Sequence, residues 1–549
     1  MNHEALIAAA EAWLAQDPDA ETRAELRAVL DSGDEAELAD RMGSRIGFGT
    51  AGLRGLVGAG SNRMNRVLVG QAAAGIGNYL LAKAAPGETP SVVIGFDARK
   101  NSRVFAQDSA EILAGMGITV VMYDRFVATP LISFAVRCQG LSAGIMVTAS
   151  HNPRGDNGYK VYLGGANGGS QIVEPSDVEI AAEIAKVAAT TTFAQLTKST
   201  NYATVPEQAI DYYFELTGRL LHPDAVRQPL KIVYTPLHGV GWAWLQRMLA
   251  ENNFAEPILV AEQVVPDPAF PTTPFPNPEE DGALDLAFAT ARSQGADLVV
   301  ANDPDADRVA IAVRDSASAS GYRPLTGDEI GLLLGWEVAT SRALTSRGGT
   351  LAESIASSGA LAAVARLTNL KHVETLTGFK WVARVPNLAF GYEEALGYCV
   401  DPEHVPDKDG LTAALVLIEL AENLAASGRT LLDQLEVIQR QIGYFLTAQV
   451  SIRLESISAV KARMAAIEAA PPATVAGLSA QVRSIAEAYP DLPFTPGLRI
   501  DLEADRRILI RPSGTEAKLK CYLRVIGATR AEADAQLAGL TAAVRELLV

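Results

Sequence analysis

Three aspartates alternate in the stretch 303–308, which reads Asp-Pro-Asp-Ala-Asp-Arg. Carboxylates two residues apart can direct their oxygens at one hard cation when the backbone turns around it. Mg²⁺ suits such a site, because it accepts few carboxylates and takes a phosphate oxygen as a further ligand. The alternatives are a solvated acidic turn and a nucleophilic Asp303 of the kind that aspartate-dependent phosphatases use. With Arg308 closing the run, the pattern favours metal binding by Asp303, Asp305 and Asp307.

A second candidate is Ser150, in the stretch Thr-Ala-Ser-His-Asn-Pro at 148–153. The apolar run Leu141–Val147 predicts a buried strand, so Ser150 would lie at the carboxyl end of a strand, where α/β sheets keep their chemistry. A serine hydroxyl needs a base or a lowered pKa, and Asn-Gly-Tyr-Lys at 157–160 can return Lys160 to the same site. The absence of a G-x-S-x-G elbow argues against acyl transfer. Alone, the stretch is typical of a turn with an Asn-Pro break, but the three aspartates favour a reactive serine.

Two loops have the composition of anion sites. The segment 47–55 is rich in glycine, so its N–H groups can approach an anion closely, and Arg54 adds a fork of donors. The segment 511–516, Arg-Pro-Ser-Gly-Thr-Glu, forms a compact nest that fits a phosphate monoester. The donors of this nest are Arg511, Ser513, Gly514 and Thr515. The structural alternatives are a flexible connector for the first loop and a β-turn for the second.

Two further loops suit a sugar. The segment 391–397 places Glu393 and Glu394 between glycines, and carboxylates accept hydrogen bonds from paired hydroxyls. The segment 377–381, Thr-Gly-Phe-Lys-Trp, adds a cation and two aromatic rings. The alternatives are an exposed turn for the first loop and a place in the hydrophobic core for Trp381.

The composition excludes several classes of protein. Of the 549 residues, 48% are hydrophobic and 20% are charged, as in a globular protein too long for a single core. The net charge of −17 argues against a nucleic-acid surface, so an anionic substrate needs a local cluster of Arg and Lys. Three widely spaced cysteines, Cys138, Cys399 and Cys521, form neither a disulfide framework nor a zinc pattern. Since the sequence shows neither a signal peptide nor an apolar stretch of about 20 residues, we expect a cytoplasmic protein without a membrane span.

The order of elements predicts the architecture. A strand–helix–strand unit recurs at 91–123, 230–260 and 349–376, and this order predicts parallel sheet in three similar α/β domains. Residues 4–42 have the spacing of two amphipathic helices, and the proline-rich segment 265–278 is expected to be an extended loop.

The last segment of the chain has a different order of elements, which predicts an antiparallel sheet in an α+β domain. The expected strands are 445–454, 497–502, 507–512 and 518–526, and the expected helices are 456–468, 479–488 and 530–548. We therefore predict four domains, with the boundaries 1–205, 206–320, 321–441 and 442–549.

Taken together, these motifs resemble the α-D-phosphohexomutase family, which includes phosphoglucomutases, phosphomannomutases and the related phosphopentomutases. The resemblance covers about residues 45–545, and the T-A-S-H-N-P, N-G-Y-K, D-P-D-A-D-R and R-P-S-G-T-E motifs stand in the family's order. It implies a heart-shaped α/β protein with a central cleft. Three similar domains with mixed, mainly parallel sheets would be followed by a smaller C-terminal α+β domain.

The resemblance also implies a role for each candidate residue. The phosphoryl group would be carried by Ser150 and surrounded by Arg54, His151, Lys160 and Arg308, with His151 or Lys160 as the acid–base group. Mg²⁺ would be held by a phosphoserine oxygen and by Asp303, Asp305 and Asp307. The sugar would contact Glu393, and its orientation would be sensed by Thr377, Gly378, Phe379 and Lys380. The phosphate that does not react would be gripped by Arg511, Ser513, Gly514 and Thr515.

The implied activity is the interconversion of hexose 1-phosphate and hexose 6-phosphate, glucose first and mannose next, with a sugar bisphosphate as intermediate and activator. Many hexose enzymes of the family have a serine where this chain has Ala395, and its E-E-A form resembles phosphopentomutases and glucose-1,6-bisphosphate synthases. A pentose phosphate mutase is therefore the first alternative, followed by a Mg²⁺-dependent phosphatase and by a catalytically silent binding protein. The expected partner is a sugar phosphate, with no nucleic acid or membrane, and the chain would be a monomer or a dimer.

Overall fold

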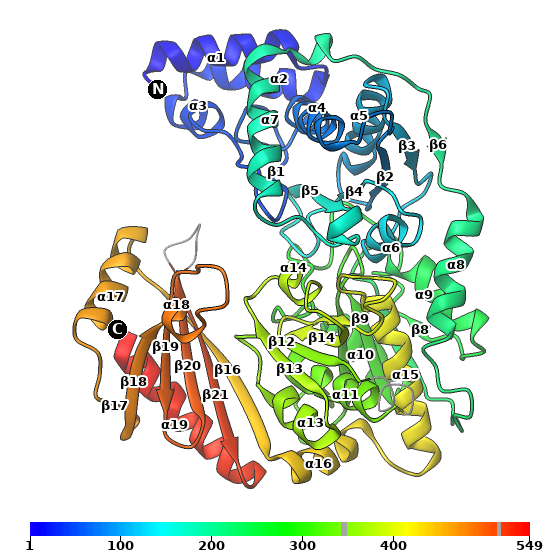
Figure 1. The fold of residues 1–549 in the computed structure, drawn as a ribbon, viewed down its shortest axis with the longest axis vertical. Helices are drawn as coiled ribbons and strands as arrows, with labels where there is room; N and C mark the ends of the chain where they lie inside the picture. The colour runs from blue at the N-terminus through cyan, green and yellow to red at the C-terminus, as the bar shows by residue number, and fades with distance from the viewer. Residues whose placement is uncertain (342–347, 513–517, 549) are drawn as a thin grey trace. The chain divides into compact units, whose positions relative to one another are not determined.

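A computed structural model of the chain describes residues 1–341, 348–512 and 518–548 (Figure 1). The chain divides into two compact units. Unit 1 comprises Met1–Pro324 and Asp401–Asn423, and unit 2 comprises Leu325–Val400 and Leu424–Val549. Two sheets belong to each unit within the described residues.

The chain begins with three helices, where the sequence predicted two over 4–42. They are α1 (His3–Gln16), α2 (Ala20–Ser32) and α3 (Glu35–Met42). The additional break follows from capping. Gly33 ends α2 in the left-handed region with φ 67°, and the Asp34 carboxylate accepts the N–H of Glu37 to begin α3.

The first sheet of unit 1 has the strand order β1-β5-β4-β2-β3-β6. Its strands are β1 (Leu53–Leu56), β2 (Ser91–Phe96), β3 (Thr119–Met122), β4 (Ala143–Val147), β5 (Asp156–Leu163) and β6 (Ala203–Thr204). Its helices are α4 (Arg66–Lys83), α5 (Ser102–Gly115), α6 (Pro130–Cys138) and α7 (Ser176–Thr190). β5 pairs antiparallel with β1 and β4, and the other pairs are parallel. The predicted unit at 91–123 is confirmed, because α5 connects the parallel strands β2 and β3.

The second sheet of unit 1 has the order β11-β10-β9-β7-β8. Its strands are β7 (Ile232–Thr235), β8 (Ile258–Leu259), β9 (Leu298–Asn302), β10 (Val309–Arg314) and β11 (Tyr322–Pro324). Its helices are α8 (Glu207–Gly218), α9 (Gly241–Glu251) and α10 (Asp285–Gln294). The unit predicted at 230–260 is confirmed by the parallel pair β7 and β8, and 265–278 contains neither helix nor strand, as predicted.

The first sheet of unit 2 has the order β13-β12-β14-β15 and confirms the third predicted unit. Its strands are β12 (Thr350–Ser354), β13 (Lys371–Thr375), β14 (Leu388–Glu393) and β15 (Gly397–Cys399). The helices of unit 2 that accompany this sheet are α11 (Gly327–Thr340), α13 (Ala360–Thr368), α14 (Phe379–Val382) and α16 (Leu431–Ile442). Between them in the sequence, α15 (Gly410–Ala426) lies mostly in unit 1. No single helix among the described residues is both long and apolar enough to cross a membrane. α15 and α16 together reach that length and composition, but the pair is bent by 92° at the break between the two helices.

The C-terminal sheet is antiparallel, as predicted, with the order β16-β21-β20-β19-β18-β17. Its strands are β16 (Tyr444–Arg453), β17 (Thr474–Val475), β18 (Leu478–Ser484), β19 (Leu498–Leu502), β20 (Arg506–Pro512) and β21 (Lys518–Gly527). Its helices are α17 (Ile457–Ala469), α18 (Ile485–Ala488) and α19 (Arg530–Leu548).

The helix predicted at 479–488 is wrong in most of its length, because β18 occupies its first part and only the single turn α18 is helical. Leu478, Ala480 and Val482 pack against the core of the C-terminal sheet. This period of two is the strand signal that the prediction overlooked.

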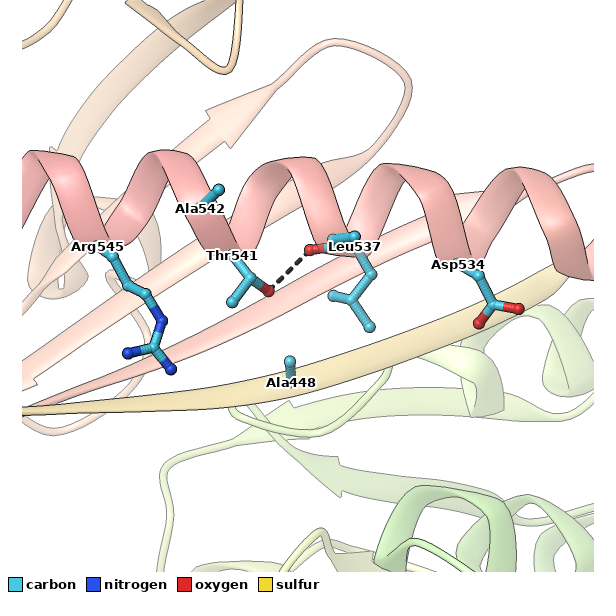
Figure 2. Close-up of a pocket in the computed structure, with 7 residues that line it drawn as sticks. Ala448, Asp534, Leu537, Thr541, Ala542 and Arg545 are labelled. Atoms are coloured by element: carbon cyan, nitrogen blue, oxygen red, sulfur yellow. Dashed lines mark hydrogen bonds between the residues drawn. The ribbon is translucent and has the colours of Figure 1, made fainter. Parts of the chain in front are cut away.

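A shallow groove of about 550 Å³ lies between α19 and β16 (Figure 2). Its wall is mainly apolar, and the Thr541 hydroxyl donates to the Leu537 carbonyl within the helix at 2.7 Å. None of the residues that the sequence assigns to a site lines this groove.

The two faces of β20 pack against different parts of unit 2. Ile508 and Ile510 lie in the core beneath α17 and α19, so Arg507, Leu509 and Arg511 occupy the opposite face. Leu509 packs there with Ile355 and Leu376, which flank β12 and β13.

Arg507 is the polar anchor of the same interface. Its Nη1 donates to Glu374 Oε1 at 2.7 Å and to the Tyr489 hydroxyl at 2.8 Å, and its Nη2 donates to the Ile355 carbonyl at 2.7 Å. Because Arg511 is four residues further along the same strand, this buried anchor also fixes the place of Arg511.

Replacing Glu374 with Gln is expected to destabilise unit 2 at neutral pH by about 1.5–3 kcal/mol, the range for a hydrogen bond to a charged group. Burial alone would raise the pKa of Glu374, but the Arg507 guanidinium lowers it, and the net pKa lies below its usual value of 4.5. With the folded-state pKa depressed, the stabilisation is present above the unfolded pKa and is lost as the pH falls through the folded pKa. Melting temperatures measured from about pH 7 down to about pH 3 should therefore converge for wild type and Glu374→Gln.

The matched control is the exposed Glu503, for which Glu503→Gln should melt like wild type at every pH. A difference between wild type and Glu374→Gln that stays constant over the whole pH range would contradict the ion pair as its source.

Candidate active site

Ser150 lies in the loop that directly follows β4, and its residue is buried. Thr148 fixes this loop, because its hydroxyl accepts the N–H of Ser150 at 2.8 Å and donates to Asp97 Oδ2 at 2.6 Å. Ser150 has a φ of 52°, in the left-handed region that costs a residue with a Cβ about 1–2 kcal/mol. The surrounding contacts therefore hold Ser150 in a backbone conformation that is unfavourable for an isolated serine.

Asp303, Asp305 and Asp307 occupy the turn of the antiparallel β9–β10 hairpin. Ala306 takes a φ of 54°, and the N–H of Arg308 donates to Asp303 Oδ1 at 2.9 Å. The three aspartates are at most 1% exposed, and their ligand oxygens lie within 4.8 Å of one another. The backbone thus turns so that three aspartates at alternate positions direct their carboxylates to a common centre, as the sequence analysis required.

The serine loop and the aspartate hairpin meet inside unit 1. Ser150 Oγ donates to Asp303 Oδ2 at 2.8 Å. Lys160, on β5, donates through Nζ to Asp305 Oδ2 at 2.7 Å and to Asp307 Oδ2 at 2.8 Å. The fold therefore brings together a hydroxyl, an ammonium group and three carboxylates from segments far apart in the sequence.

The aspartate cluster has the donor set of a site for a hard divalent cation. Asp305 Oδ1 and Asp307 Oδ1 are buried, and neither accepts a hydrogen bond. Burial, and then the charges of Asp305 and Asp307, raise the pKa of Asp303 well above its usual value. Because a buried carboxylate oxygen without a partner is costly and a divalent cation coordinates such oxygens, the residues present fit a metal ion such as Mg²⁺.

Three more of the predicted residues surround Ser150. His151 Nδ1 lies 3.1 Å from Ser150 Oγ, and Arg54 Nη1 donates to Asn152 Oδ1 at 3.0 Å. Arg308 Nε lies 3.9 Å from Asp307 Oδ1. Burial, and then the charges of Arg308 and Arg54, lower the pKa of His151 well below its usual value, so its ring is neutral near pH 7.

Lys160 has the opposite electrostatic environment. Burial alone would lower its pKa, but the charges of Asp305 and Asp307 outweigh burial, and the net pKa lies above the usual value. Lys160 is therefore a charged ammonium group bound to Asp305 and Asp307, whereas His151 is a neutral ring beside the Ser150 hydroxyl.

The structure adds residues that the sequence analysis did not recognise. Lys408 donates through Nζ to Asp307 Oδ2 at 2.7 Å, and Thr129, at the start of α6, donates its hydroxyl to Asp305 Oδ2. Arg99 donates to the carbonyl of Ser150 at 2.7 Å. The available signal for Lys408 was the charged run Asp-Lys-Asp before the apolar helix α15, and the signal for Arg99 was an Asp-x-Arg at the end of a buried strand.

In unit 2, the predicted sugar and phosphate residues also lie together. The Gly378 N–H donates to Glu393 Oε1 at 2.5 Å, and Arg511 donates through Nη1 to the Thr377 hydroxyl. Glu394 accepts the Ser354 hydroxyl at 2.7 Å.

The other residues of these loops have varied surroundings. Phe379 is buried and packs with Val382, and Lys380 Nζ lies 5.5 Å from the centroid of the Trp381 ring. Trp381 packs, partly buried, against an apolar cluster, the alternative considered for it above. Ala395 lies in the turn between β14 and β15, and Ser513, Gly514 and Thr515 lie outside the described residues.

Three family models match the chain one after another. They are described as phosphoglucomutase/phosphomannomutase alpha/beta/alpha domains I, II and III, and they match residues 45–191, 211–317 and 326–440. A Haemophilus influenzae protein named "Probable phosphomannomutase" is 44% identical over 485 residues, which cover 88% of this chain and 98% of that protein. The chain belongs to the α-D-phosphohexomutase family. It is an enzyme of the phosphomutase class, as the sequence predicted.

Other members of the α-D-phosphohexomutase family carry other substrate names. Human phosphopentomutase is 37% identical over 462 residues, covering 79% of this chain and 74% of that protein. A Staphylococcus aureus phosphoglucomutase is 33% identical over 528 residues, covering 89% of this chain and 91% of that protein. The relatives thus show the family, while their names cover two hexoses, mannose and glucose, and a pentose.

The aspartate cluster predicts that Mg²⁺ stabilises this phosphomutase and that replacing Asp305 with Asn abolishes the stabilisation. A ligand present at about 100 times its dissociation constant adds about 2.7 kcal/mol to the stability of the state that binds it. The melting temperature of the wild type should therefore rise with Mg²⁺ concentration, and that of Asp305→Asn should not. The control is the exposed Asp297, on the surface of unit 1, for which Asp297→Asn should respond like wild type. An equal response of Asp305→Asn to Mg²⁺ would show that the cluster is not the metal site.

Proposed function

We propose that this phosphomutase interconverts the 1-phosphate and the 6-phosphate of a hexose, with glucose as the first candidate and mannose as the next. The observation that carries the phosphoryl-transfer part of the proposal is the 2.8 Å hydrogen bond between Ser150 Oγ and Asp303 Oδ2. The choice of a hexose rests on the names of the relatives, phosphomannomutase and phosphoglucomutase. The hydrogen bond places a hydroxyl that can carry a phosphoryl group directly beside a cluster that fits a divalent cation. Phosphoryl transfer depends mainly on such positioning and on neutralising charge.

We assign phosphoryl transfer to the residues of unit 1. A phosphate on Ser150 would carry about −1.5 to −2 charges. Positive charge is available from Arg54, Lys160, Arg308 and Lys408. Asp303, Asp305 and Asp307 would hold Mg²⁺, which when bound neutralises charge on the phosphoryl oxygens.

The reaction runs in two transfers. A hydroxyl of the sugar phosphate attacks the phosphorus on Ser150, the bond from phosphorus to Ser150 Oγ breaks, and a sugar bisphosphate forms. After this intermediate has turned around, the Ser150 hydroxyl accepts its other phosphoryl group, and the isomeric sugar phosphate leaves. Each transfer needs a group that takes the proton of the attacking hydroxyl. The neutral ring of His151 is the candidate for taking this proton, and the charged ammonium group of Lys160 is the candidate for giving a proton to the oxygen that leaves. A sugar bisphosphate would restore Ser150 phosphate that had been lost.

We assign recognition of the sugar to the residues of unit 2. Glu393 would accept sugar hydroxyls, and the loop of Thr377, Gly378, Phe379 and Lys380 would sense the orientation of the sugar. The contacts of Gly378 with Glu393 and of Arg511 with Thr377 support a shared role for these loops. The non-reacting phosphate would be bound by Arg511, Ser513, Gly514 and Thr515.

One observation favours a pentose phosphate as the second candidate. Ala395, which follows Glu393 and Glu394, offers no hydroxyl to a sugar. The hydroxyl of Ser354 contacts the same turn, but it already donates to Glu394. A smaller sugar would need fewer contacts there, and human phosphopentomutase is a relative of this chain.

All three cysteines are free thiols, which suits a reducing compartment. We therefore place the enzyme in the cytoplasm, where its sugar phosphate substrates would also be found.

Replacing Ser150 with Ala is expected to remove both the covalent phosphate and the mutase turnover. Wild type incubated with a sugar bisphosphate should gain one acid-stable phosphate, which peptide mapping should locate on Ser150. The control, Ser293→Ala on the exposed side of α10, should keep both properties. A hydroxylamine-labile phosphate on Asp303, with Ser150→Ala still active, would replace the mutase by an aspartate-dependent phosphatase.

Kinetics on a panel of sugar phosphates should show a hexose as the preferred substrate. The panel contains the 1-phosphates of glucose, mannose, glucosamine, ribose and deoxyribose, each with Mg²⁺ and a trace of bisphosphate. We expect kcat/KM for a hexose to lead by at least tenfold, about 1.4 kcal/mol of transition-state preference. Ala395→Ser should raise kcat/KM for that hexose by about threefold to tenfold, as one new hydrogen bond would. A pentose that leads by the same margin would overturn the hexose assignment.

A further inference from the structure

Arg99 donates four hydrogen bonds to the segment that contains Ser150. The residue follows β2 and is 4% exposed. Its Nη1 donates to the carbonyl oxygens of Pro153 at 3.0 Å and Asp156 at 2.9 Å. Its Nη2 donates to the carbonyl oxygens of Ser150 at 2.7 Å and Asn152 at 2.5 Å. One planar group therefore binds four carbonyls between Ser150 and the first residue of β5, Asp156.

The guanidinium of Arg99 also contacts an aromatic ring. Arg99 Cζ lies 4.9 Å from the centroid of the Phe270 ring, a cation–π contact between buried groups. Phe270 belongs to the proline-rich segment 265–278, whose Pro274 carbonyl also accepts the N–H of Arg154 at 3.0 Å. The proline-rich segment thus supports the serine loop through both a ring and a backbone hydrogen bond.

These contacts specify the backbone on both sides of Ser150. Thr148 Oγ1 accepts the Ser150 N–H, which fixes the peptide plane before the serine. Arg99 Nη2 binds the Ser150 carbonyl, which fixes the peptide plane after it. Between two fixed planes, Ser150 keeps its left-handed φ of 52°, and its Oγ is directed at Asp303.

We propose that Arg99, stacked on Phe270, is a positioning residue that aims Ser150 Oγ for phosphoryl transfer. The inference rests on the proposed function, because it concerns the geometry of that transfer. The four hydrogen bonds need the planar fork of an arginine, and a lysine would keep the charge but offer one rotating ammonium group in its place. Geometry and charge can therefore be separated by substitution.

Three variants of the full-length protein test the proposal. Arg99→Lys retains the charge and loses the fork, and Phe270→Leu removes the ring while leaving every hydrogen bond of Arg99. The matched control is Arg103→Lys, because Arg103 is exposed and, like Arg99, its guanidinium lies near an aromatic ring, with Cζ 5.9 Å from the centroid of Phe96. For each variant we would measure kcat and KM with the preferred sugar phosphate, the melting temperature, and deuterium exchange of the peptide that covers 148–158.

We expect Arg99→Lys to lower kcat by about a hundredfold, the cost of a displacement of about 1 Å at a reacting atom, with KM unchanged. Phe270→Leu should lower kcat by about threefold to tenfold, as the loss of one cation–π contact would. Both variants should speed exchange at 148–158 and leave exchange elsewhere as in wild type. Arg103→Lys should match wild type in every measurement.

Several outcomes would overturn the proposal. Arg99→Lys with wild-type kcat and wild-type exchange would show that the fork is not needed, and a rise in KM at constant kcat would assign Arg99 to substrate binding. If Arg99→Lys does not fold, Phe270→Leu decides by the same two measurements. If wild type shows no turnover of any sugar phosphate and no phosphate on Ser150, the proposed function is wrong, and the exchange data alone decide whether Arg99 fixes the loop.

Discussion

Three buried carboxylates within 4.8 Å of one another set the main constraint on unit 1. At an effective dielectric constant of about 20, two like charges at such a separation repel by about 3 kcal/mol. The arrangement is tolerated only if cations approach from several directions. Lys160 and Lys408 both bind Asp307 Oδ2, and two aspartate oxygens still lack a hydrogen bond. The protein's own cations thus balance part of the charge, and the two oxygens without a hydrogen bond fit a metal ion.

The same constraint explains why the segment 401–423 belongs to unit 1 although its neighbours in the sequence belong to unit 2. Lys408 lies between Asp407 and Asp409, which accept the hydroxyls of Tyr162 and Tyr213 at 2.8 Å each. Gly410 follows, and a Cβ on it would lie 2.3 Å from the Arg308 carbonyl. A larger residue would push this segment away from the aspartate hairpin, so the glycine allows Lys408 to reach Asp307.

The sequence predicted the elements that apolar runs define and missed those that depend on partners distant in the chain. The three strand–helix–strand units and the loop after β4 were recognised, because a buried strand ending in small polar residues is a local pattern. Lys408 and Arg99 were missed, because nothing near them shows that their partners are Asp307 and four loop carbonyls. The third N-terminal helix and β18 were missed for a local reason, since a glycine cap and a short alternation were outweighed by helix-forming neighbours. The sequence therefore predicted the motifs of the candidate site, but the cations that balance its carboxylates could be identified only from the structure.

In both units, hydrogen bonds from a buried arginine fix the backbone near a candidate site residue. In unit 2, Arg507 is buried on the same face of β20 as Arg511, so the strand that presents Arg511 is fixed four residues earlier. In unit 1, the anchors are closer, since Thr148 and Arg99 bind the N–H and the carbonyl of Ser150 itself. Strain at a reactive residue persists only where the surroundings over-determine it. In the function proposed above, Ser150 would receive and release a phosphoryl group in each cycle, and a fixed backbone would let the charge on its side chain change without moving the main chain.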